Sequence, residues 1–309
     1  MTCGFVFPGQ GSQAVGMLRD VIDERAVRAC FDTADAAVGI GLRQLVLEGP
    51  ESELNRTELT QPALLTASVA LWRLWQDRGG ATPAVFAGHS LGEYSALVAA
   101  GALDFADAVR LVHLRGRLMQ NAVPIGTGAM AAILGLDEAA VAKCCAEVAG
   151  VVTPANINAP GQIVIAGATA AVDAAIERCS AAGAKRAIKL AVSVPSHCPL
   201  MAPVAREFGN ALASMRVAAP NIPVLQNVDA TASDDPERIR KNLVAQLSSP
   251  VRWTQCVEGM VARGTKLLLE CGPGNVLAAL IKRIDKSVTV HTIGDKDHFD
   301  AALAEVGRG

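Results

Sequence analysis

One turn constrains this chain more than any other feature. Gly88-His89-Ser90-Leu91-Gly92 follows the apolar run 84–87 and precedes a stretch of helical character that ends near Gly101. A serine in this G-x-S-x-G pattern, after a strand and before a helix, is typical of a tight turn at the carboxyl edge of a parallel sheet. The flanking small residues avoid clashes in a strained backbone, and the turn exposes the Ser90 hydroxyl. The pattern therefore predicts an α/β fold with Ser90 as a candidate nucleophile.

A second loop is a candidate partner for this turn. N–H groups at the start of the helix after Ser90 can stabilise an oxyanion, but a second donor must come from elsewhere. The segment Pro8-Gly9-Gln10-Gly11-Ser12 follows the short apolar strand 5–7, and its glycines let the backbone approach a ligand closely. An ordinary turn at a strand end explains the same residues, so both interpretations stay open at this point.

The two ends of the chain alternate strands with helices, which indicates a parallel α/β sheet. Expected helices span residues 15–48, 61–78, 104–120, 199–215, 235–247 and 275–284, with a last helix near the C-terminus. Later strands are expected at 266–270 and 288–293. We therefore predict a large α/β-hydrolase-like domain that comprises residues 1–126 and 193–309.

The middle of the chain has a different order of elements. Strands are expected at 130–134, 151–157, 163–166 and 186–192, with helices at 137–148 and 169–182. The order β-α-β-β-α-β is the ferredoxin-like pattern. We predict a small inserted ferredoxin-like domain at residues 127–192, with a turn at Asn158-Ala159-Pro160-Gly161 between its two central strands.

A nucleophilic serine needs a general base, and histidine is the usual one. His197 lies between Pro195 and Pro199 in a rigid turn before a helix, which favours it. His89 adjoins Ser90 but should point away from the tip of the turn. A simple α/β-hydrolase places its histidine late in the chain, which would favour His291 or His298. His113 lies on the polar face of the helix 104–120.

Arg115 stands out in that helix. It shares a stripe with Ala108, Leu111 and Leu118 rather than with the polar face. A buried guanidinium calls for a carboxylate partner. That partner is either a structural Asp or Glu or the carboxylate of a ligand, and the sequence pattern fits both equally well.

Composition excludes several classes of protein. The net charge of −2 argues against a nucleic-acid surface, which usually has an excess of Lys and Arg. No run reaches the roughly 18 apolar residues of a membrane helix. The eight cysteines form no CxxC pair, so we expect reduced, structural thiols rather than disulfides or a metal site. We interpret the chain as a cytoplasmic protein that binds neither nucleic acid nor a membrane.

Several motifs in order resemble one enzyme family. Phe7-Pro8-Gly9-Gln10-Gly11-Ser12-Gln13, Gly88-His89-Ser90-Leu91-Gly92-Glu93, Val194-Pro195-Ser196-His197 and Glu270-Cys271-Gly272-Pro273-Gly274 look like those of the malonyl-CoA:acyl carrier protein transacylases of bacterial fatty-acid synthesis. The resemblance spans almost the whole chain. It implies malonyl transfer from malonyl-CoA to acyl carrier protein through a malonyl-serine, without a cofactor or metal.

The resemblance also implies roles for individual residues. Ser90 is the expected nucleophile, His197 its base and Arg115 the partner of the malonyl carboxylate. The backbone N–H groups of Gln10 and Leu91 are the expected oxyanion donors. Gln246 is expected to orient His197 through its main-chain carbonyl. Asn156 and Asn158, taken to lie in the turn of the small domain, are expected near the substrate.

Three rival functions share some of these features. A freestanding acyltransferase of a polyketide pathway has the same motifs, although Val194-Pro195-Ser196-His197 resembles the fatty-acid enzymes more. A thioesterase or carboxylesterase would use Ser90 but has no need of Arg115. A non-catalytic carrier-binding module would need neither Ser90 nor His197. Because the carrier proteins of the family are usually acidic, the candidate docking surfaces are basic: Lys185, Arg186 and Lys189, or Lys282, Arg283 and Lys286.

Overall fold

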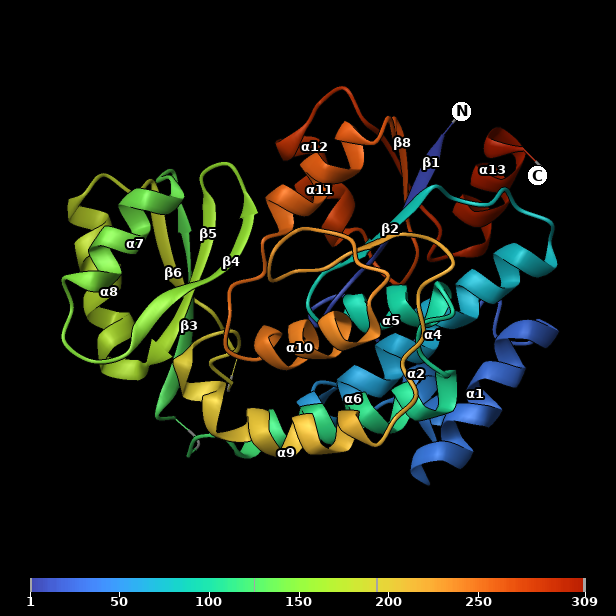
Figure 1. Ribbon diagram of the computed structural model, residues 1–309, viewed down its shortest axis with the longest axis horizontal. Coiled ribbons are helices and arrows are strands. Elements are labelled where there is room, and N and C mark those ends of the chain that lie inside the picture. The colour runs from blue at the N-terminus through green and yellow to red at the C-terminus, as the bar shows by residue number, and fades with distance from the viewer. Residues whose placement is uncertain (1, 125, 193, 308–309) are drawn as a thin grey trace.

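The computed structural model describes residues 2–124, 126–192 and 194–307. It is a mixed α/β structure with one parallel and one separate antiparallel sheet (Figure 1). The parallel sheet has the order β7-β2-β1-β8-β9. Its strands are β1 (Cys3–Phe7), β2 (Val85–Gly88), β7 (Val224–Leu225), β8 (Leu267–Glu270) and β9 (Thr289–Thr292). The mixed α/β class expected from the sequence is therefore confirmed.

Helices cover both faces of the parallel sheet. In β1, Phe5 and Phe7 point into one buried cluster and Val6 into the other, as the period of two in a strand requires. The Phe5 side contains most of the helices: α1 (Arg25–Val38), α2 (Leu42–Glu48), α3 (Glu51–Leu54), α4 (Thr57–Asp77), α5 (Gly92–Ala99), α6 (Phe105–Asn121), α9 (Ala202–Ala213), α10 (Pro236–Gln246) and α13 (Lys296–Val306). The Val6 side is covered by α11 (Trp253–Ala262) and α12 (Val276–Ile284).

The antiparallel sheet stands beside this body (Figure 1). Its strands are β3 (Gly128–Leu134), β4 (Val152–Ala159), β5 (Gln162–Ala168) and β6 (Arg186–Lys189), in the order β4-β5-β3-β6. Helices α7 (Glu138–Ala146) and α8 (Thr169–Ala181) pack on one face. On the other face, Met130 and Val164 pack with Cys198 and with Leu200 of the 3-10 helix η1 (Pro199–Met201), which follows it. This contact places the turn that carries His197 between the two sheets.

Three expected elements differ from the structure. The predicted helix 15–48 is instead a series of turns followed by α1 and α2, because Gly16 and Leu18 have positive φ and Gly39 ends α1 in a left-handed conformation. The predicted strand 186–192 ends at Lys189, after which the chain leaves the sheet. Asn156 and Asn158 lie in β4 rather than in a turn, since that strand continues to Ala159.

Three elements of the structure were not predicted from the sequence. These are the two-residue strand β7, the short helix α3 and the helix α11. The predicted domain boundaries at 126/127 and 192/193 lie beside residues 125 and 193, which are outside the described residues, as are residues 1, 308 and 309. No described helix is long and apolar enough to cross a membrane. All eight cysteines are free and buried, as expected from their spacing.

Candidate active site

The turn at Ser90 has the strained geometry that its glycines predict. Ser90 has φ +53°, a left-handed value that a residue with a side chain rarely adopts. A Cβ at Gly88 would lie 1.9 Å from the carbonyl carbon of Gly92, and one at Gly92 would lie 1.9 Å from the carbonyl oxygen of Phe7. Both glycines are therefore required by close backbone contacts, and the Ser90 side chain projects beyond the end of β2.

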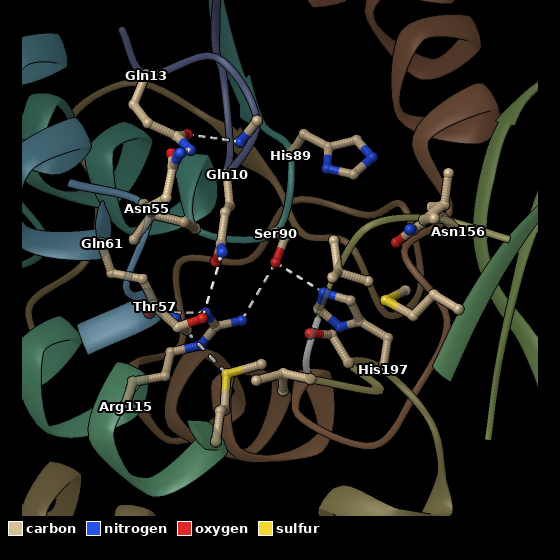
Figure 2. A pocket seen from close by; sticks show the side chains of 18 of the residues that line it. Gln10, Gln13, Asn55, Thr57, Gln61, His89, Ser90, Arg115, Asn156 and His197 are labelled. Carbon is tan, nitrogen blue, oxygen red and sulfur yellow. Dashed lines mark hydrogen bonds between the residues drawn. The ribbon is translucent and has the colours of Figure 1, made fainter. Parts of the chain in front are cut away.

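His197 is the histidine that the structure brings to Ser90. Its Nε2 lies 2.7 Å from Ser90 Oγ (Figure 2). Its Nδ1 lies 2.8 Å from the main-chain oxygen of Gln246. Since a carbonyl can only accept, Nδ1 carries the proton and Nε2 is free to accept one from the serine. Burial, followed by the positive charge of Arg115, lowers the pKa of His197 to about 3, so the imidazole is neutral at pH 7.

Three of the other four histidines lie away from the nucleophile. Nδ1 of His113 is 2.9 Å from the main-chain oxygen of Glu58. His291 Nε2 lies 3.1 Å from Glu305 Oε2, and His298 Nδ1 lies 2.7 Å from Asp295 Oδ2 at the start of α13. The late-histidine alternative taken from simple hydrolases is therefore wrong for this chain.

Arg115 enters the same site from α6, and only 1% of the residue is exposed. Its Nη2 donates to Ser90 Oγ at 3.2 Å and to Gln246 Oε1 at 3.0 Å, while Nη1 donates to Gln61 Oε1 at 2.9 Å. Its Nε has no hydrogen-bond partner, and no carboxylate in the described part of the chain forms an ion pair with it. The structural Asp or Glu considered as one partner of this arginine is absent there, which leaves a buried cation facing the serine.

The expected oxyanion donors lie around the same serine. The loop after β1 approaches the turn so closely that a Cβ at Gly9 would lie 2.5 Å from the main-chain oxygen of His89. No described group accepts a hydrogen bond from the backbone N–H of Gln10 or of Leu91. Both residues line the cavity at Ser90. Two free donors from two loops thus reach one site, as an oxyanion hole requires.

The two asparagines of β4 have different positions. Asn156 lines the cavity, and its Oδ1 is buried without a hydrogen-bond partner. Asn158 instead has its Oδ1 2.8 Å from Nε2 of His89, whose ring lies against Trp253. Asn158 therefore connects the antiparallel sheet to the turn, and only Asn156 is placed to meet a ligand.

Three polar residues of the site were not identified from the sequence. Asn227, after β7, accepts from Ser90 N through Oδ1 at 2.7 Å and donates to the Gly88 carbonyl through Nδ2 at 2.7 Å. Gln61 contacts Arg115 from α4, and Glu93 contacts Gln246 from α5. For Glu93, its place in the motif around Ser90 was a sequence signal that could have identified it. Asn227 and Gln61 are isolated amides in the sequence and carry no such signal.

These residues surround one cavity of about 390 Å³. Gln10, Ser90, Arg115 and His197 converge on it in Figure 2. Met119, Met130 and Leu190 supply apolar wall. The geometry combines an activated hydroxyl, a neutral base, two free N–H donors and a fixed cation. Such a site can form an acyl-serine from a substrate that carries a negative charge near its carbonyl.

Comparison with known proteins identifies the chemistry. The acyl transferase domain family matches residues 4–303 of this chain. The chain belongs to the acyl transferase family. This acyl transferase is 56% identical over 302 residues to the malonyl CoA-acyl carrier protein transacylase of Escherichia coli K12, covering 97% of this chain and 98% of that protein.

Solved structures of related proteins support the assignment of this chain to the acyl transferase family. An acyl carrier protein S-malonyltransferase from Vibrio cholerae superposes with a TM-score of 0.96 at 54% identity, covering 98% of this chain and 100% of that one. A malonyl transacylase solved in complex with a type II polyketide-synthase acyl carrier protein gives a TM-score of 0.97 at 51% identity, covering 99% and 100%.

Proposed function

We propose that this acyl transferase moves a malonyl group from malonyl-CoA to the pantetheine thiol of acyl carrier protein, through a malonyl ester of Ser90, in fatty-acid synthesis. One observation carries the proposal. Ser90 Oγ lies between His197 Nε2, at 2.7 Å, and Nη2 of Arg115, at 3.2 Å. A nucleophile beside a buried cation without a carboxylate suits an acyl group that brings its own carboxylate. The names of the relatives support the same substrate and carrier.

The first half-reaction uses His197 twice. Ser90 Oγ attacks the thioester carbonyl while its proton passes to His197 Nε2, and the carbonyl electrons move onto oxygen. The oxyanion is stabilised by the N–H groups of Gln10 and Leu91. When the oxyanion collapses, the C–S bond breaks and His197 returns the proton to the CoA sulfur. The Gln246 carbonyl keeps the imidazole in the tautomer that both steps need.

Arg115 is proposed to select the acyl group. A carboxylate matches a guanidinium through two parallel hydrogen bonds, and the unpartnered Nε and the Nη2 now on Ser90 are available to it. Binding also offsets the positive charge that lowers the pKa of His197. The carboxylate of the substrate should therefore make His197 more basic just when it must accept the serine proton.

The second half-reaction reverses the first with a different thiol. The pantetheine thiol gives its proton to His197 and attacks the malonyl ester, and Ser90 leaves with that proton restored. The two thiols use one site in turn, which is ping-pong chemistry. Every proton and electron pair is accounted for by protein and substrates, so the proposed reaction requires neither a metal nor a redox cofactor.

We also propose the finer description of the fold. The antiparallel strands follow the order second, third, first, fourth along the segment, with a helix after the first and the third. This arrangement supports a ferredoxin-like domain at 127–192 inserted into an α/β-hydrolase-like domain of residues 1–126 and 193–309. The free, buried cysteines support a reducing compartment such as the cytoplasm.

A transfer assay tests the function. The protein is mixed with malonyl-CoA and phosphopantetheinylated acyl carrier protein, and malonyl-carrier, free CoA and free malonate are quantified. We expect malonyl-carrier in amounts equal to free CoA, and no product from Ser90→Ala. Free malonate as the main product would instead show a thioesterase.

A further inference from the structure

The site contains a second buried charge that the proposed reaction does not use. Glu93 lies on α5, one turn after Ser90, and is 0% exposed. Its Oε2 accepts from the backbone N–H of Asn227 at 2.8 Å and from Gln246 Nε2 at 2.8 Å. Its Oε1 accepts from Gln226 Nε2 at 3.2 Å. Three donors from two distant segments therefore converge on this one carboxylate.

This carboxylate determines how the Gln246 amide is oriented. Because Glu93 only accepts when ionised, the NH₂ end of Gln246 must face it. The oxygen end then faces Arg115, where Oε1 accepts from Nη2 at 3.0 Å. A guanidinium only donates, so a reversed amide would place two donor groups against each other. In its ionised form, Glu93 is thus linked to Arg115 through one amide.

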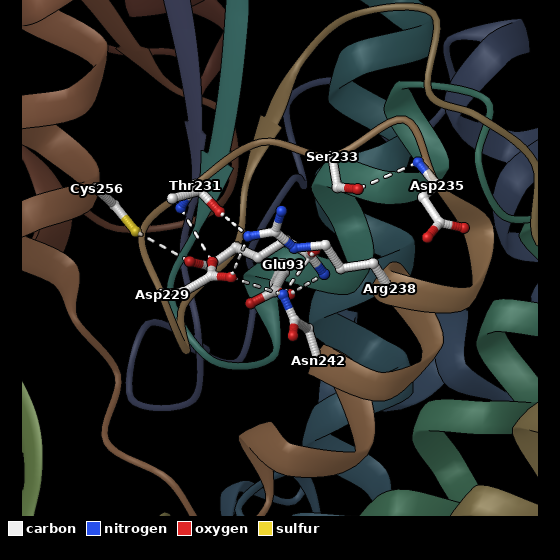
Figure 3. A network of polar contacts seen from close by, with 9 residues as sticks. Glu93, Asp229, Thr231, Ser233, Asp235, Arg238, Asn242 and Cys256 are labelled. Carbon is white, nitrogen blue, oxygen red and sulfur yellow. Dashed lines mark hydrogen bonds and ion pairs between the residues drawn. The ribbon is translucent and has the colours of Figure 1, made fainter.

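A second set of contacts holds the Glu93 carboxylate at Oε1, and Figure 3 shows its members Asn242, Asp229 and Arg238. Asn242 Nδ2 donates to Gln226 Oε1 at 3.1 Å and to Asp229 Oδ2 at 3.2 Å. Asp229 is held in turn by an ion pair with Arg238 at 2.9 Å. Since Gln226 Oε1 is occupied by Asn242, its NH₂ group must face Glu93. Each amide in this chain of contacts has one compatible orientation, a condition that makes a buried network rigid.

We propose that Glu93 is a positioning residue that acts through the side chain of Gln246 to orient Arg115 for the carboxylate of the acyl group. Glu93 touches neither the Ser90 hydroxyl nor His197 in the described structure, and its contact with Gln246 is the one that leads to Arg115. Its contact with Asn227 leads to the Ser90 turn, which both acyl groups use alike. The inference deepens the proposed function and rests on it. It assigns malonyl selectivity to Glu93 and Gln246, which lie behind the cavity, as well as to Arg115 inside it.

Glu93→Gln removes the charge at almost constant size. The new NH₂ group of the glutamine takes the place of one of the two carboxylate oxygens. At Oε2 it would meet two donors, the Asn227 N–H and the Gln246 NH₂ group. At Oε1 it would meet one donor, the Gln226 NH₂ group. The first case turns the Gln246 amide and takes the acceptor away from Arg115. The second turns Gln226 and breaks its contact with Asn242. Both cases remove the negative charge that polarises the Gln246 amide towards Arg115. Glu270→Gln is the matched control, because Glu270 is also 0% exposed and accepts from the backbone N–H groups of Leu277 and Ala278.

The experiment measures the rate of acyl-enzyme formation with malonyl-CoA and with acetyl-CoA for the wild type, Glu93→Gln and Glu270→Gln. It is run at pH 8, above the raised pKa of Glu93 of about 7, so that this carboxyl is ionised. We expect the malonyl-to-acetyl ratio to fall about tenfold in Glu93→Gln, the size expected for one lost hydrogen bond to a charged group. We expect the ratio of Glu270→Gln to equal that of the wild type. A purely structural role for Glu93 would lower both rates together and leave the ratio unchanged, which would overturn the proposal.

A second variant covers the case in which Glu93→Gln does not fold. Gln246→Met removes the amide that joins Glu93 to Arg115 and keeps the main-chain carbonyl that orients His197, and we expect the ratio to fall about tenfold. An unchanged ratio in this variant would also overturn the proposal. A wild type that forms no malonyl adduct would contradict the proposed function itself. If the wild type prefers malonyl and both variants keep its malonyl-to-acetyl ratio, the role of Glu93 is rejected while the proposed function stands.

Discussion

At the residue scale, Arg115 is the group that we propose distinguishes a malonyl from an acetyl substrate. Its guanidinium is buried beside Ser90 without an ion-pair partner in the described chain. Loss of one partner of a desolvated charge pair typically costs about 2–5 kcal/mol. We predict that Arg115→Ala lowers malonyl transfer more than tenfold and spares or raises acetyl transfer, measured as kcat/KM for both CoA esters. An equal loss on both would count against a carboxylate-binding role.

Glu93 should give the stability of the protein a distinctive pH dependence. Burial raises its pKa from 4.5 to about 7, against the opposing effect of its hydrogen bonds and Arg115. The folded state therefore binds more protons than the unfolded state between these values, and this stabilisation is lost as pH rises towards 7. Glu93→Gln removes the effect. We predict that the substitution lowers the free energy of unfolding by about 3 kcal/mol more at pH 4.5 than at pH 7.5. Chemical denaturation at both pH values measures this difference, and a difference of zero would contradict the raised pKa.

At the scale of elements, helix α6 must lie very close to the start of α4 for Arg115 to reach Ser90. A Cβ at Gly116 would lie 2.6 Å from the main-chain oxygen of Thr57 and 2.6 Å from Cα of Glu58. Gly116→Ala should therefore separate the two helices. We predict a loss of about 1–3 kcal/mol in stability together with reduced malonyl selectivity.

Gly209→Ala is the control for this prediction. Gly209 lies inside α9, where a Cβ would meet Val244 at an ordinary 3.5 Å. Alanine there should be neutral or stabilise the helix by up to about 1 kcal/mol. Thermal unfolding of both variants provides the comparison, and equal melting temperatures would show that the α4–α6 contact is not limiting.

The elements that sequence could and could not predict differ in the range of their contacts. The turn at Ser90 is encoded locally by Gly88 and Gly92, and the stripe that buries Arg115 is encoded by helical periodicity. Asn227 acts on Gly88 across 139 positions of the chain, so its role depends on the folded sheet. The segment 15–24 has apolar residues at helical spacing, yet Gly16 and Leu18 adopt positive φ and pack it as turns. Asn156 and Asn158 were misplaced because β4 continues through two polar residues.

At the scale of the whole molecule, two basic surfaces compete as the docking site of an acidic carrier. The strand β6 carries exposed Arg186 and Lys189 and leads directly into Leu190, which lines the cavity. Helix α12 carries exposed Lys282 and Arg283, and Lys282 lines a separate hollow of about 830 Å³. The direct path from β6 to the cavity favours that strand.

Charge reversal distinguishes the two surfaces. We predict that Arg186→Glu with Lys189→Glu raises the KM for the carrier about fivefold or more at low salt, without slowing acyl-enzyme formation from malonyl-CoA. The pair Lys282→Glu with Arg283→Glu should leave the KM unchanged. The reverse result would place docking on α12.

The central claim is a malonyl-selective ester on Ser90, and intact-protein mass spectrometry tests it most directly. The wild-type protein is mixed with equal amounts of malonyl-CoA and acetyl-CoA, without carrier protein, and the adduct is mapped by peptide analysis. We predict a malonyl adduct on Ser90 that exceeds the acetyl adduct and is absent from Ser90→Ala. No adduct with accumulating free malonate, or an adduct that persists in Ser90→Ala, would contradict the account.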